Sequence, residues 1–236
     1  MTAHQWTQTV RQQMRLGRFL PLGDARDGAW ISETAAGAVL RRAAESVREV
    51  RLDAVRIGLA DPQDAYEPAV PPPPSALPPG PLLVTAEFAA TASEPLPATA
   101  ARLRALLAAA AEGLGLVVAE VDLRVTGLLD EEPEPLPARA PEPASATAGG
   151  DADEEHAADA ALAVPGVRRL TGTLGRPVHI GEGQHGPTAL PRRHVRLELA
   201  VGADHRALEV VREVRATVGR ALPDQPTVAV LVTAVG

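Results

Sequence analysis

Three histidines and one glutamate are the residues whose type and spacing come closest to a chemical site in this chain. His179, His185 and His194 lie in the stretch HIGEGQHGPTALPRRH, and Glu182 lies between the first two. Zinc accepts histidine nitrogen and carboxylate oxygen as ligands, so this group could hold a zinc ion. The spacing matches no zinc motif, and the glycines and prolines favour a loop. We therefore interpret the stretch as a solvated loop and expect no metal.

Residues for covalent catalysis are absent or stand in the wrong context. The chain has no cysteine and no lysine, which excludes a thiol nucleophile, a Walker A lysine and a Schiff base. No serine lies in a G-x-S-x-G motif, and Ser32, before ETAAGAVLRRA, is typical of a helix N-cap. The GEGQHG stretch lacks the strand–loop–helix context of a phosphate site, so we interpret it as a turn. We expect a protein that is not an enzyme and that has no cofactor.

Basic residues at the N-terminus form a pattern that suits a membrane surface. The stretch HQWTQTVRQQMRLGRFL, within the N-terminal segment 1–29, contains no acidic residue. On a helix, an apolar stripe would lie beside a row of arginines: Trp6, Val10 and Met14, then Arg11, Arg15 and Arg18. This is the pattern of a basic amphipathic helix that lies on a membrane. The alternative is a helix that docks its apolar stripe on the rest of the protein.

A second group of arginines lies in the C-terminal third, where residues 160–236 hold ten basic and six acidic residues. The group consists of Arg168, Arg169, Arg176, Arg192, Arg193 and Arg196. Such a group could contact the phosphates of lipid or nucleic acid. The alternative is a solvated sheet edge, or a partner for acidic residues of the same chain. Residues 158–236 contain no aromatic side chain that could stack on a base, so we expect a protein partner rather than nucleic acid.

Two proline-rich segments divide the chain. An acidic segment at 130–157 contains almost no large apolar residue, so it cannot bury enough surface to order itself and is predicted to be a disordered linker. An insertion at 67–81, EPAVPPPPSALPPGP, is predicted to be a long exposed loop, or alternatively a polyproline II ligand. These segments leave two predicted domains, residues 30–129 and 158–236.

The two predicted domains repeat one pattern. Each has a period-two strand, which is the mark of one buried face: Val84, Ala86, Phe88 and Ala90, then Val195, Leu197, Leu199 and Val201. Each continues into a helix with one apolar face: Leu96, Ala100, Leu103, Leu107 and Ala111, then Ala207, Val211, Val214, Val218 and Leu222. Each ends in a further alternating strand: Val117, Ala119, Val121, Leu123 and Val125, then Val228, Val230, Val232 and Ala234.

A helix and a strand precede this shared pattern in both domains. In the stretch ADAALAVPGVRRLTG, Pro165 cannot continue a helix and Gly166 permits a reversal, so a strand is predicted to follow. We therefore predict an α+β fold of two tandem small domains. Each would read helix, strand, strand, long helix, strand, with its helices packed on an antiparallel sheet. The edges of these small sheets are candidate contact sites.

The second domain resembles the alkaline shock protein family, also called the envelope stress response family. VPGVRRLTG at Val164–Gly172 is similar to the family's V-P-G-V…L-x-G signature after the first helix. HVRLELAV and TVAVLVTAV are similar to its alternating strands. The resemblance covers residues 155–236 and, more weakly, 30–129.

The resemblance implies a non-enzymatic protein of the stress response that gathers at the cytoplasmic face of the cell envelope. It further implies self-association and a small membrane-anchored protein partner. No apolar run approaches the roughly 20 residues that span a bilayer, so we expect no transmembrane segment. We expect a scaffold in the cytoplasm or at the inner face of the membrane, with a nucleic-acid-associated regulatory protein as the alternative.

Overall fold

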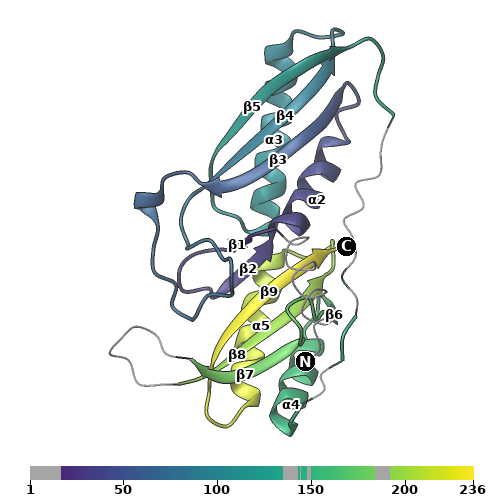
Figure 1. Ribbon diagram of the computed structural model, residues 1–236. Coiled ribbons are helices and arrows are strands. Elements are labelled where there is room, and N and C mark those ends of the chain that lie inside the picture. The colour runs from purple at the N-terminus through teal and green to yellow at the C-terminus, as the bar shows by residue number, and fades with distance from the viewer. Residues whose placement is uncertain (1–16, 135–142, 144, 148–149, 184–191) are drawn as a thin grey trace, which may run out of the picture.

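The structure, a computed structural model, describes residues 17–134, 143, 145–147, 150–183 and 192–236. The fold class is α+β, as predicted, with helices packed on open sheets (Figure 1). The strands are β1 (Phe19–Pro21), β2 (Ala29–Ser32), β3 (Val50–Leu59), β4 (Leu82–Thr91), β5 (Val118–Leu129), β6 (Val167–Leu170), β7 (Val178–Gly183), β8 (Arg192–Val201) and β9 (Thr227–Val235). The helices are α2 (Glu33–Ala44), the 3-10 helix η1 (Pro62–Asp64), α3 (Leu96–Leu114), α4 (Ala152–Leu162) and α5 (Ala207–Ala221).

Strands β3, β4 and β5 form a three-stranded sheet, and α2 and α3 cover one of its faces (Figure 1). The alternating residues of β4 point at the helices, and Val84, Ala86 and Phe88 are fully buried. Leu103 and Leu107 of α3 are also fully buried, because they lie on the helix face that meets the sheet. The predicted strand and the predicted helix face are confirmed at these positions.

Six other strands build a larger sheet in the order β1-β2-β9-β8-β6, with β7 also paired to β8. Helices α4 and α5 cover one face of it. The inward residues of β8 are Val195, Leu197, Leu199 and Val201, all fully buried as predicted.

The prediction of antiparallel sheets is wrong for three strand pairs, because β4–β5, β8–β9 and β2–β9 are parallel. In the first two cases a helix carries the chain back to the end of the sheet where the earlier strand began. The next strand must then run in the same direction as that earlier strand. The β3–β4, β6–β8 and β7–β8 pairs are antiparallel, so both sheets are mixed.

The predicted reversal at Pro165–Gly166 is confirmed. Helix α4 ends at Leu162, β6 begins at Val167, and Gly166 has a φ of +91°, a left-handed conformation that glycine adopts without strain. A Cβ atom at Gly166 would lie 2.7 Å from Cγ2 of Val210, so this position has no room for a side chain.

Helix α4 begins inside the segment predicted to be a linker. Asp151 caps it by accepting a hydrogen bond from the backbone N–H of Glu154, and its first turn is acidic. Acidic residues are favourable at this position because the N-terminus of a helix carries partial positive charge. The acidic residues from Ala152 onward, which were predicted to lie in a solvated linker, therefore form the first turn of a helix.

The N-terminal hairpin of β1 and β2 joins the sheet of the C-terminal half. Strand β2 pairs in parallel with β9, with Ala29 opposite Val230 and Ile31 opposite Val232. One continuous apolar core therefore includes residues of both halves of the chain, among them Leu40, Leu107 and Val214.

The proline-rich insertion, residues 67–81, packs across the outer face of this sheet, and we name it the proline strap. Its residue Val70 is buried in a second, smaller apolar cluster with Phe19, Trp30, Ala229 and Leu231. Trp30 donates from Nε1 to the Leu77 carbonyl at 3.3 Å, and the Leu77 N–H donates to the Phe19 carbonyl at 2.8 Å. The predicted exposed loop is thus exposed on one side only.

Candidate interaction surfaces

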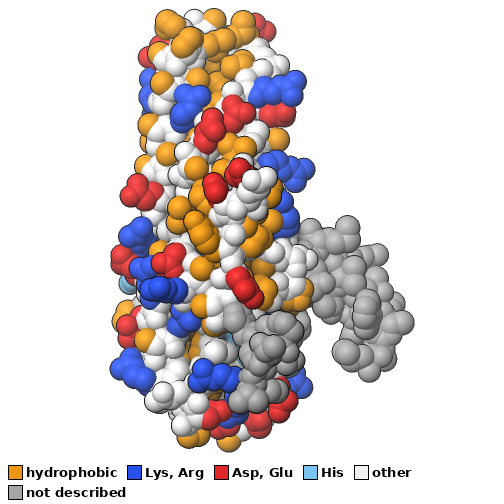
Figure 2. Space-filling model, turned by 90° about the vertical axis from the view of Figure 1, so that its left-hand side faces the viewer, with side chains coloured by type: hydrophobic (Ala, Val, Ile, Leu, Met, Phe, Trp, Pro, Cys, Tyr) orange, Lys and Arg blue, Asp and Glu red, His pale blue; other side chains and the backbone are white. Residues whose placement is uncertain are grey.

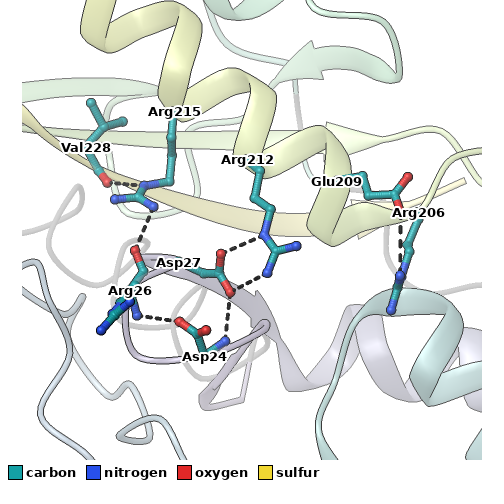
Figure 3. Close-up of polar contacts among 8 residues, drawn as sticks. All are labelled: Asp24, Arg26, Asp27, Arg206, Glu209, Arg212, Arg215 and Val228. Atoms are coloured by element: carbon teal, nitrogen blue, oxygen red, sulfur yellow. Dashed lines mark hydrogen bonds and ion pairs between the residues drawn. The ribbon is translucent and has the colours of Figure 1, made fainter.

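The largest polar cluster drawn in Figure 3 joins the β1–β2 turn to α5. Asp27 is only 7% exposed and accepts two hydrogen bonds from Arg212, at 2.7 Å from Nε and 2.9 Å from Nη2. The backbone N–H of Asp24 donates a third bond to Asp27 at 2.8 Å. Burial opposes ionisation of Asp27, but these hydrogen bonds outweigh it, so its pKa lies below its usual value.

Arg215 completes the same cluster. Its Nε donates to the Val228 carbonyl at 2.8 Å and its Nη1 to the Arg26 carbonyl at 2.9 Å (Figure 3). Burial lowers the pKa of Arg215. The polar groups of Asp27, Arg212 and Arg215 are therefore used to fasten the turn to the helix. We interpret the cluster as a structural clamp rather than as a reaction centre.

Glu198 on β8 is a fully buried carboxylate that the sequence analysis missed. It accepts hydrogen bonds from the backbone N–H groups of Thr173, at 2.7 Å, and Leu174, at 3.0 Å. Burial raises its pKa to about 7. The one available signal is a charged residue between the leucines of RLEL, on the strand face opposite to Leu197 and Leu199. Glu198 holds the turn between β6 and β7, and its carboxylate is not exposed to solvent.

The histidines of the candidate zinc group are only partly brought together. His179 on β7 lies opposite Arg196. His194 on β8 lies opposite Gly181, and a 2.8 Å hydrogen bond joins its Nδ1 and the Thr227 hydroxyl. Glu182 points to the other face of β7 from His179, because successive side chains of a strand alternate. His185 lies outside the described residues. No group of three or more potential metal ligands occurs in the part of the chain that the structure describes.

The arginines of the C-terminal third do not form one continuous face. Arg168 and Arg169 lie on β6, beside the end of β8, whereas Arg192 and Arg193 lie at the start of β8. At about 3.3 Å per residue, Arg192 and Ala200, which pairs with Arg169, are about 26 Å apart. The two pairs of arginines therefore lie too far apart to bind one small anion together.

Two of these arginines contact the segment that was predicted to be an acidic linker. Arg169 donates to the Pro143 carbonyl at 2.9 Å, and Arg193 pairs with Asp153 of α4 and with Asp224. These contacts agree with the alternative interpretation, in which the arginines contact the acidic segment of their own chain. Arg168 and Arg192 are exposed. Of the predicted amphipathic helix, Trp6, Val10, Arg11, Met14 and Arg15 lie outside the described residues. Arg18 is described; it lies directly before β1, outside any helix, and pairs with Glu33.

Among the described strands, β5 carries the exposed large apolar side chains, and we name residues 117–129 the β5 edge. Val117, Val125 and Leu128 are 49%, 40% and 65% exposed. Sequence alternation predicted a half-buried strand here, but along β5 itself only Val121 is buried. Figure 2 faces the side of the molecule on which β5 lies and shows acidic, basic and apolar side chains close together there.

A groove of about 490 Å³ runs between α3 and the first half of the β5 edge. Its lining consists of Arg104, Ala108 and the residues from Val118 to Asp122. Arg104 reaches across the groove from α3 and donates from Nε to the Val121 carbonyl at 3.0 Å. A charged side chain over a strand edge is a common means of discouraging pairing with other strands.

Other described strand edges form hydrogen bonds with backbone or side-chain groups of the same chain. The proline strap covers β1 through the hydrogen bonds of Phe19 with Ser75 and Leu77. On β3, Ile57 donates to Glu33, and its carbonyl accepts from Arg18 at 2.7 Å. On β6, the Leu170 carbonyl accepts from the Ala146 N–H. On the outer side of the β5 edge, the contact described is the hydrogen bond from Arg104 to the Val121 carbonyl.

A comparison with protein-family models and with curated proteins finds no match to this chain. The resemblance to alkaline shock proteins therefore rests on the residues quoted above and stays a prediction. Among the described residues, no helix is long and apolar enough to cross a membrane.

Proposed function

We propose that this protein is a non-enzymatic interaction protein of the envelope stress response type. It acts as a scaffold at the cytoplasmic face of the cell envelope and binds a membrane-anchored protein. The observation that supports this proposal best is the β5 edge, where Val125 and Leu128 of the strand, and Val117 just before it, are exposed at the side of a small sheet. By contrast, the buried polar groups of Asp27 and Glu198 are used to hold the fold together.

A strand edge suits protein recognition. An added strand gains main-chain hydrogen bonds, and the alternating side chains of the edge select what is added. The β5 edge offers both kinds of contact, because Val125 and Leu128 are apolar while Glu120, Asp122 and Arg124 carry charge. These features favour a protein partner over a small molecule.

The proposal is tested by crosslinking in the native cells, followed by purification of the tagged full-length chain and mass spectrometry of what it captures. Three chains are compared: wild type, Val125→Arg, and Leu162→Arg as a matched control on α4, where Leu162 is 46% exposed. We expect a membrane-anchored protein with wild type and with the control, and its loss with Val125→Arg. Nuclease-sensitive nucleic acid without any membrane protein would overturn the proposal and favour the nucleic-acid alternative.

A further inference from the structure

We infer that the β5 edge pairs with the β5 edge of a second copy of this chain, in an antiparallel arrangement centred on Leu123. The two three-stranded sheets would then form one continuous sheet across a two-fold axis. This inference rests on the proposed function for the choice of surface, and it goes further by naming a second copy as an alternative occupant of the β5 edge, one that would exclude the membrane-anchored protein while it is bound.

The charge pattern of β5 selects this register. In a two-fold pairing centred on Leu123, Asp122 of each copy lies opposite Arg124 of the other. Directly opposite residues share a face of the sheet, so the two pairs are attractive. Centring the pairing on Asp122 would place two aspartates opposite each other, and centring it on Arg124 would place two arginines there. Like charges in these positions are destabilising.

The apolar residues agree with the same register. Val121 lies opposite Val125, and the exposed Leu128 lies opposite Val118. From Glu120 to Val125 the strand pairs with β4 without irregularity, so the centre of the edge is straight enough to accept a second strand on its other side. The exposed surface of Val125 and Leu128 would be removed from water on pairing, which favours association.

Arg104 makes the pairing conditional. Its Nε hydrogen bond to the Val121 carbonyl covers the point next to the proposed two-fold axis. A second strand can pair there only after this side chain has moved away. Arg104 therefore opposes association, and its removal would favour the paired state.

The test measures the mass of the purified full-length chain by sedimentation equilibrium over a wide range of concentrations. We expect a reversible dimer for wild type. Asp122→Arg and Arg124→Asp, made singly, should each weaken it about tenfold, because each turns two attractive pairs into two repulsive ones. The double exchange Asp122→Arg with Arg124→Asp should restore it, and Arg104→Ala should tighten it. Control reversals at two exposed residues, Glu67→Arg and Arg48→Asp, should leave it unchanged.

Two results would overturn the inference: a wild-type chain that stays monomeric at all concentrations, or a dimer that the double exchange weakens more than either single change. These results are separable from the test of the proposed function. A monomer that still captures a membrane-anchored protein through Val125 ends this inference and leaves the proposed function intact. A dimer that captures no such protein does the opposite. Circular dichroism and unfolding midpoints identify any variant that fails to fold.

Discussion

Replacing Glu198 by glutamine should change how the stability of this protein depends on pH. The carboxyl of Glu198 is fully buried, and burial raises its pKa from 4.5 to about 7. Between these two values the folded chain holds a proton that the unfolded chain has released. The free energy of unfolding therefore falls as pH rises through this window, and the full loss is reached above the folded-state pKa.

The magnitude follows from that difference in pKa. A rise from 4.5 to about 7, at about 1.4 kcal/mol for each pH unit, makes the ionised form cost about 3 kcal/mol of stability. Glutamine keeps an acceptor oxygen for the backbone N–H groups of Thr173 and Leu174, but it never ionises. Loss of the second carboxylate oxygen costs about 1 kcal/mol. We therefore expect the Glu198→Gln variant to be about 2 kcal/mol more stable than wild type at alkaline pH and slightly less stable in acid.

The assay is urea unfolding of both chains at a series of pH values on either side of the window. All other carboxylates are common to both chains, so their contributions cancel when the free energy of unfolding of wild type is subtracted from that of Glu198→Gln. This difference should rise with pH and then level off. Glu67→Gln, at an exposed residue of the proline strap, serves as the control and should change the free energy of unfolding much less than Glu198→Gln does at alkaline pH. Parallel curves for wild type and Glu198→Gln, or a difference that falls as pH rises, would refute the reasoning.

Three further changes test other parts of the structure. Asp27→Asn should lower the free energy of unfolding by about 2 kcal/mol at neutral pH, measured in urea, and the loss should vanish in acid, where the depressed pKa of Asp27 is crossed and wild type is protonated too. Gly166→Ala should cost about 2 kcal/mol, because φ is +91° and Val210 occupies the space, whereas Gly113→Ala, with open space around it, should be neutral or stabilising in the same assay. Val70→Asp should release the proline strap and make it the first site of limited proteolysis, because it buries a carboxylate in an apolar cluster; unchanged cleavage would contradict the docked strap.

Local periodicity predicted those elements whose burial has a regular period. Strand β4 and helix α3 each bury one face, so the burial of Phe88 and Leu107 could be predicted from the sequence alone. Strand β1 is three residues long and gives no such pattern. It pairs with β2, and β2 in turn pairs with β9, at the far end of the described chain, and no local rule predicts a partner at that distance.

The candidate surface was predicted only in outline. Sheet edges were expected to be contact sites, but the identity of the exposed edge depends on which strands lie outermost, and that is a property of the assembled sheet. The clamp shows the same limit, since Asp27 and Arg212 lie 185 residues apart in sequence. Charge and type mark each residue as polar, whereas their pairing follows from the arrangement of β1, β2 and α5.

The parallel pairing of β2 with β9 affects the order in which the protein can fold during its synthesis. Strand β9 lies between β2 and β8 and leaves the ribosome after the other described strands. The hairpin of β1 and β2 is synthesised long before β9, so the edge of β2 that pairs with β9 must wait without its partner until Thr227–Val235 emerge. Contacts this distant in sequence are slow to form, and the waiting segments are vulnerable to aggregation. A chain cut short before Thr227 would thus lose the strand that joins its beginning to its end, so a small C-terminal truncation should be as damaging as a large one.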